Sequence, residues 1–444
     1  MAPPARRRQG EQSITRGNPS DEFTETAKTP GRLHYNALSM VKKLQVHAAD
    51  LRGVNRLTIA GISGIVEVVE AMHHSIATIP RMIATPKHDG TTGITRLIYR
   101  SIHAVLGLVG HGLDSLLARL TPLLGERSTW PGREALLAAL NGVLGDYLEA
   151  SNNPLAITMC LRRNGIALPG EREPLAAAIL QASPKLVVLV HGLCMNDLQW
   201  KRKRHDHGAA LARDLGYTPV YLYYNSGLHI STNGRAFAEQ LENLVHLWPV
   251  DLTELVLIGH SMGGLVARSA FHYGALARHE WPHRVDKLVF LGTPHHGAPL
   301  ERGGNWVDIL LGVSKYSAPL ARIGKIRSAG ITDLRFGNLV DEDWNKGDRF
   351  ARTGDRRVAV PLPEGVACFA IGASIGTTAS DLSGGLLGDG IVPLASALGH
   401  HADPRLALPF DESRQWVAYK TNHIDLLNRT EVYAQIKRWV TASS

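Results

Sequence analysis

Residues 255–268 of the 444-residue chain, LVLIGHSMGGLVAR, decide the fold. Four consecutive apolar residues at 255–258 predict a buried strand, and residues 264–268 begin a helical pattern. Between them, residues 259–263 form a Gly-x-Ser-x-Gly turn in which side chains at the glycine positions would crowd the serine. The stretch therefore predicts a sharp strand-to-helix turn that presents Ser261 as a nucleophile.

A serine hydroxyl needs a base to take its proton and an acid to orient that base. In chains with this kind of turn, the order is serine, acid, histidine. Asp389 lies downstream between two glycines in GDGIVP (388–393), a setting that leaves its carboxylate free at a strand end. An Asp-Gly turn without a catalytic role is the competing interpretation. Asp381 and Asp425 are the reserve candidates for the acid.

The candidate base is His423, in the sequence TNHID (421–425). It lies in a short loop ahead of an amphipathic C-terminal helix, where it could reach across to the serine. His400 and His401 compete with it, but they lie in a surface-like turn close to the acid. We predict Ser261, Asp389 and His423 as a catalytic triad.

An oxyanion intermediate also needs hydrogen-bond donors, most often two backbone N–H groups. Met262 follows the nucleophile directly and supplies one. The second is expected from the loop HGLCMND (191–197) after the first strand, with Leu193 as the predicted donor and Cys194 as the alternative.

Strands and helices alternate around the serine turn, which predicts an α/β fold with a mostly parallel sheet. Expected strands cover 185–190, 218–224, 255–258, 287–291 and 368–371, and expected helices cover 208–215 and 233–247. The predicted catalytic domain spans about 180–444. An insertion at about 297–365 follows the fourth strand and is expected to be a cap or lid, with an ordinary surface excursion as the alternative.

Two regions precede this domain. Residues 1–30 are rich in Pro, Arg, Gly, Ser and Thr and predict a disordered basic tail. Residues 50–150 carry three apolar stripes at helical spacing and predict a helical N-terminal region. Those helices fit two roles, packing on the catalytic domain or contacting lipid through their apolar stripe.

Composition narrows the class of protein. The chain is 44% hydrophobic and 20% charged, as in ordinary globular proteins, and three separated cysteines predict free thiols rather than disulfides or a zinc site. A net charge of +8 permits contact with an anionic membrane surface. No secretory signal, membrane-spanning run or nucleic-acid motif is legible, so we expect a cytoplasmic protein, with peripheral membrane contact left open and no nucleic-acid partner.

Five motifs in order, VLVHGLCMND, IGHSMGG, LVFLGTPHHGAPLERGGN, GDGIVP and TNH, resemble α/β-hydrolase lipases and esterases. They are most similar to bacterial proteins related to the catalytic domain of GPI inositol-deacylases (PGAP-like). The resemblance covers about 180–444 and implies carboxylic-ester hydrolysis with the predicted triad. His295 and His296 match a family signature outside the triad, and we interpret them as structural or pocket-lining. Unlike the deacylases themselves, this chain has no membrane span.

The sequence thus predicts a serine hydrolase that acts on an ester or lipid and needs no metal or organic cofactor. Acyl transfer, thioester cleavage and polyester cleavage could use the same triad. A protein that binds lipid surfaces mainly through its N-terminal helices is the alternative from another class. The basic run Lys201–Arg204 is either a solvated face or a rim facing anionic lipid.

Overall fold

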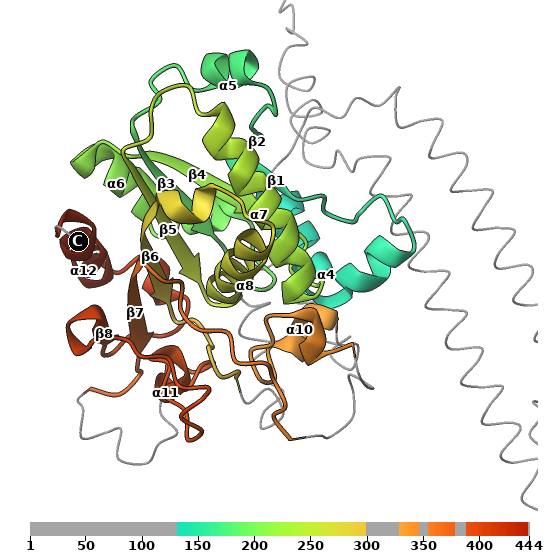
Figure 1. Cartoon of the computed structure of the whole chain (residues 1–444), viewed down its shortest axis with the longest axis vertical. Helices are drawn as coiled ribbons and strands as arrows, with labels where there is room; N and C mark the ends of the chain where they lie inside the picture. The colour runs from blue at the N-terminus through green and yellow to red at the C-terminus, as the bar shows by residue number, and fades with distance from the viewer. Residues whose placement is uncertain (1–130, 299–327, 346–353, 378–387, 443–444) are drawn as a thin grey trace, which may run out of the picture. The chain divides into compact units, whose positions relative to one another are not determined.

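The computed structural model describes residues 131–298, 328–345, 354–377 and 388–442 (Figure 1). The predictions for the tail at 1–30, for most of the helical region 50–150 and for the apolar positions between 307 and 326 lie outside these residues. The structural account below concerns the described part of the chain.

A single sheet organises the described residues, in the strand order β2-β1-β4-β3-β5-β6-β7-β8. The six strands from β4 to β8 pair in parallel, while β1 pairs antiparallel with β4 and β2 pairs antiparallel with β1. The strands are β1 Cys160–Arg163, β2 Ile166–Ala167, β3 Lys185–Val190, β4 Thr218–Tyr223, β5 Glu254–His260, β6 Val285–Leu291, β7 Ala367–Ala373 and β8 Gln415–Ala418. The expected mostly parallel sheet is confirmed.

Helices cover both faces of this sheet (Figure 1). The α-helices are α4 Pro131–Ala150, α5 Arg172–Ala178, α6 His207–Leu215, α7 Ile230–Leu247, α8 Met262–Leu276, α10 Ala329–Asp333, α11 Leu394–Ala397 and α12 Thr430–Thr441. The 3₁₀ helices are η2 Asp197–Trp200, η3 Trp281–Arg284, η5 Asp341–Asp343, η7 Glu412–Arg414 and η8 Asp425–Leu427.

The central strands are apolar on both faces, and alternate side chains enter two separate cores. In β3, Leu186, Val188 and Val190 join the core beneath α4, α7 and α8. Val187 and Leu189 join the opposite core beneath α6 and α12. Both sets are completely buried, which is why β3 appears in the sequence as a continuous apolar run rather than an alternating one.

The structure extends the sheet upstream of residue 180. The hairpin of β1 and β2 adds an antiparallel edge next to β4, and Leu161 of β1 is buried. The third predicted apolar stripe forms α4, whose Leu140, Val143 and Leu148 belong to the same core as α7 and α8. Residues 131–167 are therefore built into the same layers as the strands that follow them.

None of the helices in the described ranges is both long and apolar enough to cross a bilayer.

Candidate active site

Ser261 lies between the end of β5 and the start of α8, as the sequence predicts. Its backbone has φ +55° and ψ −127°, a conformation that residues other than glycine rarely adopt. A Cβ on Gly259 would lie 2.5 Å from Gly264 Cα, and one on Gly263 would lie 2.2 Å from the carbonyl oxygen of Val190. The two glycines therefore permit the close approach of helix, turn and strand that holds Ser261 at the strand end.

Asp389 and His423 form a buried pair. His423 Nδ1 donates to Asp389 Oδ2 at 2.6 Å, and the His423 amide donates to the Asp389 carbonyl oxygen at 3.1 Å. The other carboxylate oxygen, Oδ1, accepts from the amides of Ile391 and Val392 at 3.0 and 2.8 Å. Because both oxygens are held, the carboxylate fixes His423 in the tautomer whose Nε2 is unprotonated.

That second ring nitrogen is the chemically important one. His423 Nε2 is buried and has no hydrogen-bond partner among the described residues. A buried imidazole nitrogen without a partner is unfavourable unless a proton donor reaches it in another state of the site. It is therefore available to accept a proton.

Two sets of contacts bring this pair next to Ser261. The Ser261 amide donates to the carbonyl oxygen of Leu291 at 2.8 Å, at the end of β6. A Cβ on the next residue, Gly292, would lie 3.1 Å from His423 Nδ1 and 3.2 Å from Asp389 Oδ2. On the other side of the turn, the rings of His260 and His423 have centroids 4.8 Å apart. The structure thus gathers the three predicted residues at the carboxyl ends of β5, β6 and β7.

The loop after β3 lies against the same turn. A Cβ on Gly192 would lie 2.9 Å from Ser261 Cβ, so the loop backbone passes directly beside the serine. The amide of Cys194 donates to Ser226 Oγ at 3.1 Å. Among the described residues, the amides of Leu193 and Met262 have no acceptor in the turn and loop hydrogen bonds. Because the Cys194 amide is already bonded, Leu193 remains the better candidate of the two loop residues for the oxyanion donor.

The alternative candidates for the acid and the base are paired with other groups or lie elsewhere. Asp425 pairs with Lys203 at 2.9 Å and also accepts from Asn422, so its carboxylate serves the basic run rather than a histidine. His401 contacts the backbone of Asp403, and His400 is exposed. Asp381 lies outside the described residues.

Several residues around the loop after β3 and the end of β4 pack in the interior. Tyr224 donates to the carbonyl oxygen of His191 at 2.8 Å and stacks on its ring, and Asn225 donates to the Gly145 carbonyl oxygen in α4. Burial lowers the pKa of His191 to about 3, so its ring is neutral. Cys194 and Cys368 are buried thiols and Cys160 is half-buried, all unpaired.

Sequence reasoning missed the residue that precedes the nucleophile. His260 is fully buried, and its Nε2 donates to the carbonyl oxygen of His423 at 3.1 Å. Burial, followed by the proximity of His423, holds the pKa of His260 well below its usual value. Its position inside the serine motif was visible in the sequence, but nothing there indicated a contact with a loop 163 residues away.

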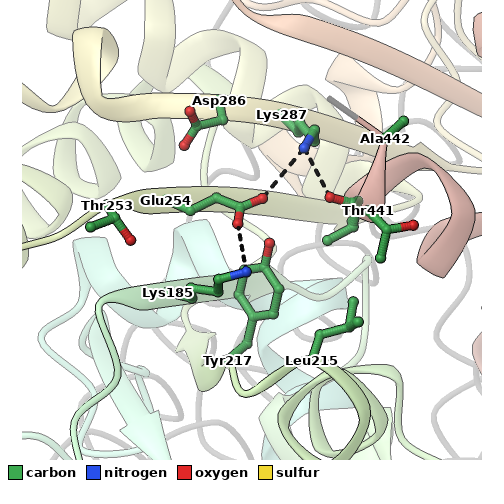
Figure 2. Close-up of a pocket in the computed structure, with 10 residues that line it drawn as sticks. Lys185, Leu215, Tyr217, Thr253, Glu254, Asp286, Lys287, Thr441 and Ala442 are labelled. Atoms are coloured by element: carbon green, nitrogen blue, oxygen red, sulfur yellow. Dashed lines mark hydrogen bonds and ion pairs between the residues drawn. The ribbon is translucent and has the colours of Figure 1, made fainter. Parts of the chain in front are cut away.

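A pocket of about 340 Å³ lies at the amino ends of the parallel strands, opposite to the end that carries Ser261 (Figure 2). Figure 2 shows Glu254 between Lys185 and Lys287, with its carboxylate 3.4 Å from each ammonium group. Glu254 begins β5 while Ser261 follows its last residue, and a strand rises about 3.3 Å per residue, so roughly 20 Å separates the two. Both lysines of this pocket pair with Glu254, and the pocket lies away from the serine turn.

Across the described ranges, no group of three or more His, Cys, Asp or Glu side chains gathers as metal ligands would.

A family model described as the PGAP1-like alpha/beta domain matches residues 181–358, which include β3, the serine turn and β6. No curated protein sequence matches the chain.

Several solved structures resemble the fold. The lipase BlEst2 of Bacillus licheniformis is 18% identical, with a TM-score of 0.38 over 64% of this chain and 98% of its own. Lipase B of Aspergillus fumigatus is 12% identical, with a TM-score of 0.36 over 62% of this chain and 59% of its own. The esterase Pf2001 of Pyrococcus furiosus is 12% identical, with a TM-score of 0.35 over 59% of this chain and 81% of its own.

The parallel sheet, the strained serine between β5 and α8 and the family match agree on one fold. The chain has the α/β-hydrolase fold and matches the PGAP1-like alpha/beta domain over residues 181–358.

Proposed function

We propose that the chain is a serine hydrolase that cleaves carboxylic esters through an acyl-enzyme. Ser261 is the nucleophile, His423 the general base and acid, and Asp389 the residue that orients His423. The observation that carries this proposal is the buried 2.6 Å bond between His423 Nδ1 and Asp389 Oδ2, which leaves His423 Nε2 free beside the serine turn.

In the first half of the reaction, Ser261 Oγ attacks the ester carbonyl carbon while His423 Nε2 takes the hydroxyl proton. The negative charge that develops on the carbonyl oxygen is stabilised by the amides of Leu193 and Met262. The Met262 amide also stands at the N-terminus of α8, where the helix dipole favours an anion. His423 then gives its proton to the departing alcohol, and the acyl group stays on Ser261.

The second half releases the acid. Water replaces the alcohol, and its oxygen attacks the acyl carbon while His423 takes one of its protons. The bond from the acyl carbon to Ser261 Oγ then breaks, His423 returns the proton to Oγ, and the carboxylic acid leaves. Asp389 stabilises the imidazolium that forms in each half. The site residues need no metal or organic cofactor for these steps.

The substrate class we propose is an ester or lipid with an apolar acyl chain. The match to the PGAP1-like alpha/beta domain supports this choice. Transfer of the acyl group to another alcohol, or cleavage of a thioester or polyester, would use the same residues.

The first test is hydrolysis of p-nitrophenyl esters of increasing acyl length by the full chain and by Ser261→Ala. We expect the substitution to remove nearly all turnover, since removing a triad member in a serine hydrolase costs on the order of 10⁶-fold. A fluorophosphonate probe should label the full chain at Ser261, as read by peptide mass spectrometry. Hydrolysis that survives in Ser261→Ala would refute the proposal.

A second candidate function is lipid-surface binding through the residues before Pro131, where the sequence predicts apolar helical stripes. Liposome flotation of the full chain and of a truncated chain tests it. The truncation must end before Pro131, since α4 is part of the domain core. Binding that disappears on truncation while esterase activity persists would make the deleted region a targeting module.

A further inference from the structure

Arg268 is a buried cation on α8, two helical turns beyond Ser261. It is only 4% exposed. Its Nη2 donates to the carbonyl oxygen of Val360, and its Nη1 lies 3.4 Å from His295 Nδ1. Its Nε is buried and has no hydrogen-bond partner among the described residues. Of five guanidinium N–H donors, these contacts occupy two.

No described carboxylate pairs with Arg268. Another cation, Arg357, acts on Arg268 electrostatically, and its guanidinium donates to the His295 carbonyl oxygen at 2.9 Å. Arg357 has its own carboxylate, Asp355, at 2.9 Å, so this second arginine is neutralised. Burial, followed by the charge of Arg357, lowers the pKa of Arg268 to about 9. Among the described residues, the cluster therefore carries one positive charge that no carboxylate offsets.

Buried charges in proteins are normally paired, because an unpaired ion loses its hydration without compensation. The neighbouring imidazoles cannot supply the missing negative charge. His295 is fully buried, and burial together with Arg268 holds its pKa well below the usual value, so its ring is neutral. The contact with Arg268 Nη1 requires that same neutral form, with Nδ1 as the acceptor.

A cavity of about 110 Å³ lies against this arginine. Its polar wall comprises Arg268, Arg357, His295, His296 and Arg405, and Arg405 is paired with Asp403 at 2.6 Å. The rest is formed mainly by the segments 358–361 and 406–409, which contribute several apolar side chains. A water molecule takes up about 30 Å³ in the liquid, so the cavity holds a ligand of only a few non-hydrogen atoms.

We propose that this cavity is a binding site for a small aliphatic monocarboxylate, of the size of acetate to butyrate, held by Arg268. A carboxylate brings the single negative charge that the cluster lacks, and its two oxygens match the fork of a guanidinium. The apolar walls suit a short alkyl tail. A phosphate group would bring about −1.5 to −2 charges into a cavity with one charge to neutralise. The proposal does not depend on the esterase function.

The test is isothermal titration of the full chain with sodium butyrate, alongside sodium chloride and neutral butyramide at equal concentration. We expect saturable binding of butyrate alone and a rise in thermal midpoint that follows its concentration. Arg268→Met removes the charge and keeps an apolar side chain of similar length. Its dissociation constant for butyrate should rise about tenfold or more, since the charge-assisted bonds are lost.

A second variant covers the case in which Arg268→Met does not fold. Ala407→Phe leaves Arg268 in place and fills the cavity, and it should abolish butyrate binding. Arg213→Gln, which removes an exposed arginine paired with Asp214 on α6, is the matched control and should bind as the unaltered chain does. Butyrate binding that persists in Ala407→Phe would overturn the proposal. So would an absence of binding in the unaltered chain, or saturable binding of inorganic phosphate in its place.

Discussion

His260 Nε2 donates to the carbonyl oxygen of His423 at 3.1 Å, so the residue before the candidate nucleophile fixes the backbone of the candidate base. The His260 ring is fully buried and is also in edge contact with Trp200. Because His260 acts on His423 through this backbone bond, we regard it as a positioning residue. It links the two loops whose spacing decides whether His423 Nε2 can meet the serine hydroxyl.

We expect His260→Phe to lower kcat about tenfold with little change in KM, because the ring volume is kept but the bond to His423 is lost. His260→Gln can still donate to that carbonyl oxygen and should recover part of the rate. Steady-state kinetics across pH 5–9 on a p-nitrophenyl ester would measure both effects. Equal losses in the two variants, with an unchanged pH profile, would mean that His260 contributes packing only.

Replacing Asp389 by asparagine should be far more damaging to activity than to folding. Asparagine keeps an oxygen for the amides of Ile391 and Val392, but its NH₂ group faces His423 Nδ1 and stabilises the wrong tautomer. In the serine-protease template the equivalent change costs about 10⁴-fold in kcat, and we expect a loss of that order here. Circular dichroism and ester hydrolysis measure the two effects separately.

Asp425, two residues after His423, provides the control for Asp389→Asn. Asp425 pairs with Lys203 near the surface, so Asp425→Asn should change turnover by less than about threefold. If Asp425→Asn were instead the damaging change, the orienting acid would have been misassigned.

How much of the fold and of the candidate site could be predicted from the sequence depends on burial. The strand 185–190 was predicted with its observed bounds because all but its first residue is buried, which leaves an uninterrupted apolar run. The serine turn, Asp389 and His423 could also be predicted, because glycines flank the first two and His423 lies in a short loop motif. The structure places the serine turn, Asp389 and His423 close together.

The edges of the sheet were not predicted, for a physical reason. In β1, Leu161 alone is buried, and both residues of β2 are exposed, so neither strand has a hydrophobic pattern. In β8, three of four residues are only half-buried. The stripe of α4 predicts a helix but does not say what the helix packs against. The uncompensated charge of Arg268 is likewise invisible in sequence, because it depends on which residues surround the guanidinium.

Gly192 provides a steric test of the oxyanion loop. A Cβ at this position would lie 2.9 Å from Ser261 Cβ and 3.3 Å from His260 Nδ1, so Gly192→Ala should push the loop away from the serine. We expect kcat to fall by about 10²-fold, comparable to the loss of one oxyanion donor. Gly170→Ala is the control, since nothing lies within 4 Å of its added Cβ. A fully active Gly192→Ala enzyme would argue against Leu193 as a donor.

His207 should make the fold sensitive to acid. It is fully buried, with Nε2 donating to the carbonyl oxygen of Leu426 at 2.9 Å, and burial lowers its pKa to about 3 from an ordinary value of 6.5. Because the unfolded chain binds the proton more readily, this contribution to stability is complete above about pH 6.5 and is lost as pH falls toward 3. The free energy of unfolding should fall by about 1.4 kcal/mol per pH unit, or roughly 2 kcal/mol by pH 5.

Urea unfolding from pH 7 to 5 measures this effect. The free energy of unfolding of His207→Phe should depend less steeply on pH, even if the substitution lowers stability at pH 7. His283→Gln removes an exposed imidazole and should keep the original slope. Parallel curves for His207→Phe and the unaltered chain would show that His207 does not carry the acid sensitivity.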